Sequence, residues 1–369
     1  MAVNIGIVGL PNVGKSTLFN ALSNAGAEAA NFPFCTIEPN VGVVPVPDPR
    51  VTRLAQLAAS KKVTPTSLEF VDIAGLVEGA ARGEGLGNQF LSHIRQVDAV
   101  AHVVRCFEHD DVTHVHGGLD PQRDVEIIEA ELILKDLETV EKRLDKAQKY
   151  KKAAGKQGEQ ARKEADTLAA LREHLNSGGT AATFAMEAEQ QPIVQELFLL
   201  TAKPVVYIAN ISEDRVSDPD SVPAVQALRR LAEARGTEVV AISAAIEAEV
   251  AQLPEDEQTA YLDALGLQEP GLHRMIRASY DLLGLITYLT TGPDETRAWT
   301  IPKGTRAPQA AGVIHSDFER GFIKAEVIHH DELVALGSEA AARQAGKLRI
   351  EGKEYVVQDG DVIHFRFNV

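Results

Sequence analysis

A phosphate-binding loop is the clearest chemical signal in this 369-residue sequence. Residues 9–16 read GLPNVGKS and fit the pattern G-x-x-x-x-G-K-S/T, between an apolar run and a helical stretch. In such a loop, backbone N–H groups and the positive end of the helix dipole surround phosphate oxygens. Lys15 would reach the β- and γ-phosphates, and the Ser16 hydroxyl would bind Mg²⁺. The predicted nucleotide contacts here are Asn12, Val13, Gly14, Lys15, Ser16 and Thr17.

Two more oxygen donors complete a predicted magnesium site. Asp72 ends an apolar run and begins the motif D-x-x-G, so its carboxylate can hold Mg²⁺ through water, while the Gly75 N–H can sense the γ-phosphate. Thr36 lies between the two motifs and is expected to join the magnesium shell when the γ-phosphate is bound. Five glycines within 75–87 favour a nucleotide-gated switch. The predicted metal ligands are Ser16, Thr36 and Asp72.

The sequence 210–213, NISE, stands where guanine-binding proteins of this architecture carry N-K-x-D. Ile211 replaces the lysine that covers the base, and Glu213 replaces the aspartate that accepts hydrogen bonds from guanine. Since adenine has no N2 amine, we expect adenine to be accepted and preferred to guanine. The alternative is that Asp214 takes over the guanine-binding role. The predicted base contacts are Asn210, Ile211, Glu213, Ser243 and Ala244.

Water activation is less clearly encoded. Ras-type GTPases orient the attacking water with a glutamine after the D-x-x-G glycine, and this chain has Leu76 there. Leucine neither donates nor accepts a hydrogen bond, so we expect slow intrinsic hydrolysis. The loop 108–117 carries three histidines, of which we predict that His114 polarises water, with Lys15 as the second catalytic residue. The alternative is a solvent-facing histidine loop without a catalytic role.

Several short apolar runs must position these groups. Helical segments separate them, which predicts an α/β fold: a P-loop NTPase with a doubly wound, mostly parallel sheet. Apolar residues at helical spacing between 106 and 204 predict an inserted helical hairpin, and short strands after 284 predict a small β-rich domain. The runs are 3–8, 68–71, 99–106, 204–209 and 239–242; the predicted domains are 1–125 and 199–283 (nucleotide-binding), 126–198 (hairpin) and 284–369 (C-terminal).

Composition narrows the class of protein. The formal charge of −16 argues against a protein held to nucleic acid by its overall field. Two cysteines cannot make a disulfide framework, and no run approaches the roughly 18 apolar residues of a membrane helix. Since the first residues also lack a basic leader, we expect a cytoplasmic enzyme or switch. Against the overall charge, residues 142–163 hold nine Lys/Arg and two acids, either a solvated face or a contact to RNA phosphate or an acidic partner.

These motifs together resemble the Obg-related branch of translation-factor P-loop GTPases, and most closely its YchF, or Obg-like ATPase, subfamily. The resemblance covers essentially the whole chain and implies ATP hydrolysis favoured over GTP, association with ribosomes and a C-terminal TGS domain. Asn12 resembles the asparagine that binds K⁺ in potassium-stimulated relatives. The stretches that carry it are 9–17, 31–42, 72–91, 210–213, 269–272 and 297–327.

Two functions remain open at this point. The first is a magnesium-dependent ATPase whose nucleotide state controls ribosome binding, through the hairpin 142–163, the TGS domain or both. The alternative is a nucleotide-gated binding module, specific for GTP or accepting both nucleotides, in which hydrolysis is incidental. A metabolic kinase is disfavoured, because no acceptor pocket or catalytic-base motif is evident.

Overall fold

The chain forms two compact units. The computed structural model describes residues 3–28, 40–73, 86–108, 118–151 and 155–368. The first unit comprises Met1–Val43 and Glu69–Met275, and the second comprises Val44–Leu68 and Ile276–Val369. The chain thus enters the second unit twice. Within the described residues, no helix is both long and apolar enough to span a membrane.

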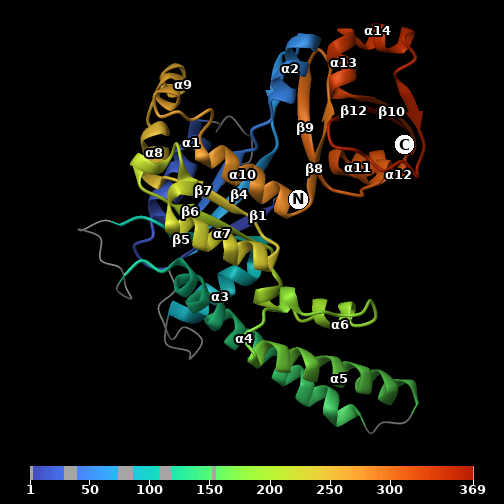
Figure 1. Cartoon of the computed structure of the whole chain (residues 1–369). Coiled ribbons are helices and arrows are strands. Elements are labelled where there is room, and N and C mark those ends of the chain that lie inside the picture. The colour runs from blue at the N-terminus through green and yellow to red at the C-terminus, as the bar shows by residue number, and fades with distance from the viewer. Residues whose placement is uncertain (1–2, 29–39, 74–85, 109–117, 152–154, 369) are drawn as a thin grey trace. The chain divides into compact units, whose positions relative to one another are not determined.

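A six-stranded sheet organises the first unit, in the order β2-β4-β1-β5-β6-β7. The four pairings from β4 to β7 are all parallel. Helices α1 and α8 lie on one side of the sheet, and α3 and α7 lie on the other (Figure 1). The predicted doubly wound α/β fold is therefore confirmed. The strands are β1 (Asn4–Val8), β2 (Val41–Pro45), β4 (Ser67–Asp72), β5 (Ala99–Arg105), β6 (Val205–Asn210) and β7 (Val239–Ile242); the helices are α1 (Lys15–Glu28), α3 (Leu86–Gln96), α7 (Pro223–Arg235), α8 (Ala244–Val250), α9 (Glu255–Ala264) and α10 (Gly271–Leu282).

The predicted helical hairpin is also present in the first unit (Figure 1). Its helices are α4 (Pro121–Tyr150) and α5 (Lys156–Asn176). Asp120 caps α4, because its carboxylate accepts a hydrogen bond from the Arg123 N–H at 3.1 Å. The two helices bury a shared apolar stripe, and three short helical segments follow: η2 (Ala181–Thr183), α6 (Gln191–Gln195) and η3 (Leu200–Ala202).

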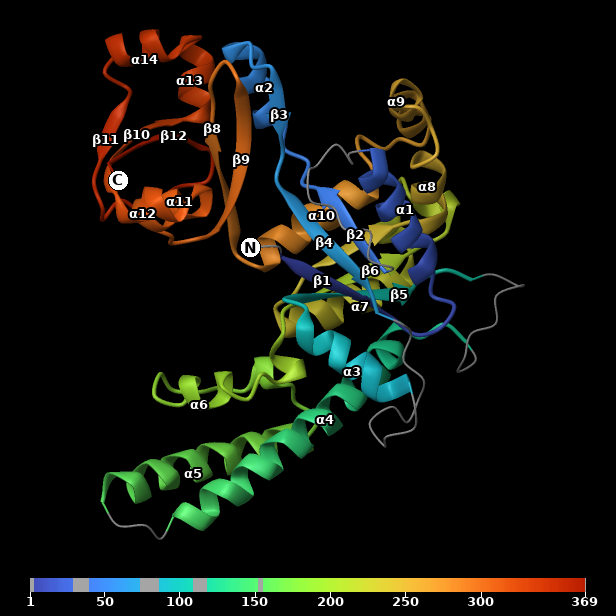
Figure 2. The same cartoon turned by 180° about the vertical axis from the view of Figure 1, so that it is seen from behind.

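The second unit contains another six-stranded sheet, in the order β11-β10-β12-β8-β9-β3 (Figure 2). The sequence predicts one helical piece here, at 338–345; the structure has α14 at that place and three more helices after 284. Alanine-rich residues 307–314 form the longest of these three. The strands are β3 (Lys62–Thr64), β8 (Leu285–Thr290), β9 (Glu295–Pro302), β10 (Phe322–His329), β11 (Arg349–Glu351) and β12 (Asp361–Phe367); the helices are α2 (Pro49–Ala58), α11 (Ala307–Ile314), α12 (Ser316–Arg320), α13 (His330–Leu336) and α14 (Glu339–Gln344).

The segment Val44–Leu68 differs from the predicted division, which assigned it to the nucleotide-binding domain. Strand β3 pairs in parallel with β9 and extends the second sheet. Helix α2 buries Val51 and Leu54 in the same apolar cluster as Leu289 and Ile328. Both packing interactions lie inside the second unit, which explains why the segment belongs there. The second unit also begins at Ile276, earlier than the predicted boundary at 284.

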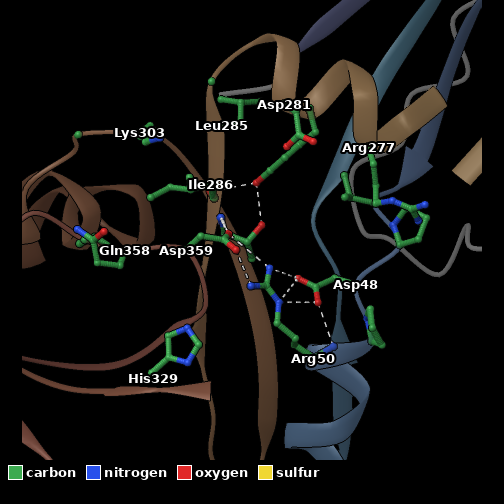
Figure 3. Close-up of a pocket in the computed structure, with 18 of the residues that line it drawn as sticks. Asp48, Arg50, Arg277, Asp281, Leu285, Ile286, Lys303, His329, Gln358 and Asp359 are labelled. Atoms are coloured by element: carbon green, nitrogen blue, oxygen red, sulfur yellow. Dashed lines mark hydrogen bonds and ion pairs between the residues drawn. The ribbon is translucent and has the colours of Figure 1, made fainter. Parts of the chain in front are cut away.

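Arg50 fixes the start of α2 within this unit. Its guanidinium lies between the carboxylates of Asp48 and Asp359, as Figure 3 shows. Arg50 Nε donates to Asp48 Oδ1 at 2.9 Å, and Nη1 donates to Asp359 Oδ2 at 2.6 Å. Asp359 Oδ1 in turn accepts a hydrogen bond from the Thr287 N–H at 2.9 Å. These contacts tie the loop before β12 to both α2 and β8, beside a cavity of about 1020 Å³.

Candidate functional site

The phosphate loop joins the end of β1 to the start of α1. Asn12 and Gly14 both have positive φ angles, 63° and 92°, which turn the loop back on itself. The Leu18 N–H donates to the Gly14 carbonyl at 3.0 Å and so begins the helical pattern directly after the turn. A Cβ atom on Gly14 would lie 2.2 Å from Asn210 Nδ2. Glycine is therefore required at this position for both its conformation and its size.

Asn210 links the phosphate loop to the loop after β7. Its Nδ2 donates to the Val13 carbonyl at 2.8 Å, and its Oδ1 accepts from the Ala244 N–H at 2.9 Å. The side chain is buried, with 4% of its surface exposed. Its own carbonyl accepts a hydrogen bond from the Cys106 N–H at 2.8 Å. One residue at the carboxyl end of β6 thus fixes the positions of three loops relative to one another.

A cavity of about 610 Å³ lies among these loops. It is within the usual size range of small-molecule pockets, which is about 300 to 1,000 Å³. The predicted phosphate and base segments both contribute to its lining, so residues about 200 positions apart in the sequence meet here. The predicted contacts that line it are Asn12, Gly14, Thr17, Asn210, Ile211, Glu213, Ser243 and Ala244, joined by Asp214.

Ile211 shows what replaces the lysine of the N-K-x-D motif. Although it contributes to the cavity wall, only 3% of its surface is exposed, and it belongs to an apolar cluster with Val225 and Leu228 of α7. Its backbone N–H donates to the Ile242 carbonyl at 2.8 Å. The side chain therefore stabilises the sheet–helix interface, and no cationic stem stands at this position. Glu213, in contrast, is exposed at the cavity.

The predicted contacts omit four residues of the cavity: Ser212 and Ala245, which lie beside predicted base contacts, and Phe107 and Glu108, which come from another loop. The Arg105 guanidinium lies over the Phe107 ring, 4.6 Å from its centroid, and Arg105 Nε donates to the Phe107 carbonyl at 3.0 Å. Phe107 and Glu108 lie in the loop that follows β5. Because ligands of parallel α/β sheets bind at the carboxyl ends of the strands, their position after a central strand was a usable signal.

The predicted magnesium ligands are only partly within the described residues. Ser16 is exposed at the start of α1, and the Lys15 ammonium forms an ion pair with the Asp72 carboxylate. A hydroxyl and a carboxylate are the hard oxygen donors that Mg²⁺ takes alongside phosphate oxygens and water, so this donor set fits the ion. In the part of the chain that the structure describes, no group of three or more His, Cys, Asp and Glu could form a separate metal site. Thr36, Gly75, Leu76 and His114 lie outside the described residues.

The basic window 142–163 is less basic in three dimensions than in sequence. Three of its nine cations pair with carboxylates that lie outside the window. Lys142, Lys146 and Lys149 of α4 have no ion-pair partner in the described chain, are exposed and share one helix face by their spacing of four and three residues. The ion pairs are Arg143–Glu164, Lys151–Asp166 (2.8 Å) and Lys163–Glu189 (3.1 Å).

Two family models match the chain. A model described as "50S ribosome-binding GTPase" matches residues 4–151, which include the phosphate loop and Asp72. A model described as "Protein of unknown function (DUF933)" matches residues 285–368, which include all but one strand of the second sheet.

Curated proteins and a solved structure resemble the chain over its whole length. "Ribosome-binding ATPase YchF" of Bacillus subtilis (strain 168) is 56% identical over 369 residues, with 100% of both chains covered. The protein of the same name from Escherichia coli O157:H7 is 51% identical, again with 100% of both chains covered. The "Structure of the Schizosaccharomyces pombe YchF GTPase" superposes with a TM-score of 0.89 at 38% identity, covering 99% of this chain and 97% of that one.

Proposed function

The chain belongs to the YchF family, and from this premise we propose that it is a ribosome-binding ATPase whose bound nucleotide controls its attachment to the ribosome. The observation that carries the proposal is the cavity in which the phosphate loop and the segment after β6 meet through Asn210. One wall of this cavity would bind the phosphates of a nucleotide, and the other wall would bind its base. We place the protein in the cytoplasm, where ribosomes are found.

The phosphate end of the nucleotide belongs against residues 12–17. Backbone N–H groups of this loop bind phosphate oxygens, and Lys15 exchanges its ion pair with Asp72 for the β- and γ-phosphates. Ser16 and Asp72, with Thr36, would hold Mg²⁺, which when bound neutralises charge on the phosphates. Gly75 would sense the γ-phosphate through its N–H.

The base end belongs against the loops that follow β5, β6 and β7. The buried Ile211 offers no cation to the base, and the longer carboxylate of Glu213 lacks the geometry of the guanine-binding aspartate. Adenine, which needs no acceptor for an N2 amine, is therefore the better ligand. We assign Phe107 to stacking against the base, since it lines the cavity and presents an aromatic ring there.

Equilibrium binding of fluorescent ATP and GTP analogues with Mg²⁺ tests this assignment. The parent protein should prefer ATP, and Glu213→Asp should move the preference toward GTP. Adding Ile211→Lys should move it further but also destabilise the fold, because the lysine would replace a buried side chain. Asp214→Asn serves as the control: a loss of GTP binding in this variant alone would indicate that Asp214 reads the base. A parent that prefers GTP would contradict the ATPase assignment.

For hydrolysis, we propose that His114 polarises the attacking water in place of the glutamine that Leu76 replaces, and that K⁺ at Asn12 adds positive charge near the phosphates. Single-turnover hydrolysis should fall in His114→Ala while ATP affinity stays unchanged. In Asn12→Ala, exchange of Na⁺ for K⁺ should no longer raise the rate. Unchanged turnover in His114→Ala would remove the histidine from the mechanism.

For the ribosome, we propose a contact through the unpaired lysines of α4 rather than the whole basic window. Replacing Lys142, Lys146 and Lys149 by Gln should weaken co-sedimentation with ribosomes and reduce its salt dependence. The matched control replaces Lys151 and Lys163 by Gln, since both are already paired with carboxylates. Equal binding by the triple variant would move the contact to the C-terminal domain, which we propose to be a TGS domain. Stimulation of hydrolysis by ribosomes would separate this ATPase from a binding module with incidental hydrolysis.

A further inference from the structure

Phe198, in the short connection between α6 and η3, is displayed to solvent in an unfavourable backbone conformation. Its side chain is 74% exposed, the largest exposure among the big hydrophobic residues of the described chain. Its φ angle is +48°, in the left-handed region that favours glycine. A bulky apolar residue that is both exposed and held at positive φ lowers the stability of the fold. We therefore expect such a residue to serve in binding.

The backbone turn is what directs the ring outward. The Phe198 N–H donates to the Gln195 carbonyl at 3.2 Å and closes the end of α6, a position at which helices commonly carry glycine. The leucines on either side point the other way: Leu199 is 2% exposed, and Leu197 packs against the apolar stripe of the hairpin. Of these three side chains, the Phe198 ring is the one that joins no apolar cluster formed by the described residues.

The residues after Phe198 are held rigidly. Asp136 of α4 is fully buried, and its carboxylate accepts hydrogen bonds from the Leu200 N–H at 2.7 Å and the Thr201 N–H at 2.8 Å. It also accepts one from the Thr201 hydroxyl at 2.7 Å. Phe198 therefore projects from a backbone that is already ordered, so binding through its ring would cost little conformational entropy.

The charge of the segment that carries Phe198 favours a basic partner over RNA. Residues 187–198 contain three glutamates and no Lys, Arg or His. Glu189 and Glu196 of this segment also line a cavity of about 500 Å³ between α4, α5 and α6. Together these surfaces carry two more carboxylates than cations, which repels phosphate and attracts cationic protein surfaces. The glutamates are Glu187, Glu189 and Glu196 in the segment, with Glu159 and Glu164 in the cavity; the cations are Arg143, Lys156 and Lys163.

We propose that Phe198 is a preorganised anchor that inserts into an apolar pocket on a basic protein of the ribosome. The inference rests on the proposed ribosome binding and adds a protein contact to it. Aromatic side chains are common among the few residues that carry most of the binding energy of an interface, and the rim of such an interface is polar. The glutamates of residues 187–198 supply the matching negative charge.

Replacing Phe198 by glycine tests the inference, because it removes the ring and relieves the backbone. Phe198→Gly should bind ribosomes about 30-fold more weakly in co-sedimentation, the loss typical of an aromatic anchor. Its unfolding temperature should equal or slightly exceed that of the wild type. Ala59→Gly is the matched control: Ala59 has the same φ of 48° and is exposed, so its backbone is relieved without loss of a ring. This control should bind ribosomes like the wild type.

The possible failures can be told apart. A wild-type protein that does not sediment with ribosomes would refute the proposed function itself. Wild-type binding that persists in Phe198→Gly would refute the anchor alone, as would a lowered unfolding temperature, which would show that the ring supports the fold. Phe198→Trp should retain binding, whereas Phe198→Lys should lose it against a basic surface. Binding by Phe198→Lys at wild-type strength would instead indicate RNA at this contact.

Discussion

Replacing Asn210 by alanine should loosen the nucleotide site, because this side chain links two of its loops. The substitution removes the donor to the Val13 carbonyl and the acceptor for the Ala244 N–H. Both partners belong to buried residues, with 2% and 3% of their surface exposed, so water replaces the lost bonds poorly.

The size of the effect follows from these two hydrogen bonds. A buried polar group left without a partner costs about 1–3 kcal/mol, and two are left here. Allowing for partial relaxation around the smaller side chain, we expect the free energy of unfolding to fall by about 2–4 kcal/mol. Ordering the loosened loop on binding would add to the cost of binding, so ATP affinity should fall by about tenfold or more.

Urea unfolding without nucleotide and titration with a fluorescent ATP analogue measure the two quantities separately. Asn210→Asp keeps the acceptor for Ala244 but turns a carboxylate toward the Val13 carbonyl, so it should also lose stability. Asn20→Ala, on the exposed surface of α1, is the control. If Asn210→Ala unfolds at the wild-type urea concentration and binds ATP within twofold of the wild type, the linking role assigned to this side chain is wrong.

Three further perturbations have defined outcomes. Gly14→Ala should abolish measurable ATP binding because the added Cβ would clash with Asn210 at the end of β6, whereas Gly236→Ala, with φ of 65° and open space around it, should cost only about 1 kcal/mol in urea unfolding. Burial, with a smaller effect of a nearby arginine, lowers the pKa of His102 to about 3, so the unfolded chain takes up a proton first as pH falls below about 6.5. Between pH 6.5 and 5, the wild type should therefore lose about 2 kcal/mol more stability than His102→Leu, and parallel pH curves would contradict this. Glu247→Gln should destabilise the first unit by about 1–3 kcal/mol, since its carboxylate accepts the Gly271 N–H at 2.7 Å at the start of α10; an unchanged urea midpoint would rule this out.

The sequence predicts well those features that are encoded over a few neighbouring residues. The phosphate loop needs one strand, one turn and one helix in succession, and each has its own local signal. The buried strands are continuous apolar runs, which permit few other assignments. Asn210 illustrates the limit: its position after β6 is readable, but its contacts lie 197 and 34 residues away. Nothing near it in the sequence indicates that it links two loops.

The surface charge of residues 142–163 and the domain to which Val44–Leu68 belongs could not be predicted from neighbouring residues. The window 142–163 looks strongly basic because its pairing carboxylates, such as Asp166 and Glu189, lie beyond its end. Segment Val44–Leu68 follows a strand of the first unit directly, so the linear sequence favours keeping it there. The apolar face of α2 indicates that this helix is buried, but it does not indicate which of the two sheets covers it.

The placement of Val44–Leu68 in the second unit has a consequence for how the protein is synthesised and for how it can be cut. Arg50 meets Asp359 across 309 residues of sequence, and Thr64 meets Glu295 across 231. Helix α2 therefore leaves the ribosome long before the strands that cover its apolar face, and this unit closes only near the end of translation. Deleting the C-terminal domain would expose Val51 and Leu54 of α2 to solvent on the remaining chain. A truncation at residue 284 thus exposes an apolar surface as well as removing a domain. Point substitutions within the domain therefore test what it binds with fewer side effects.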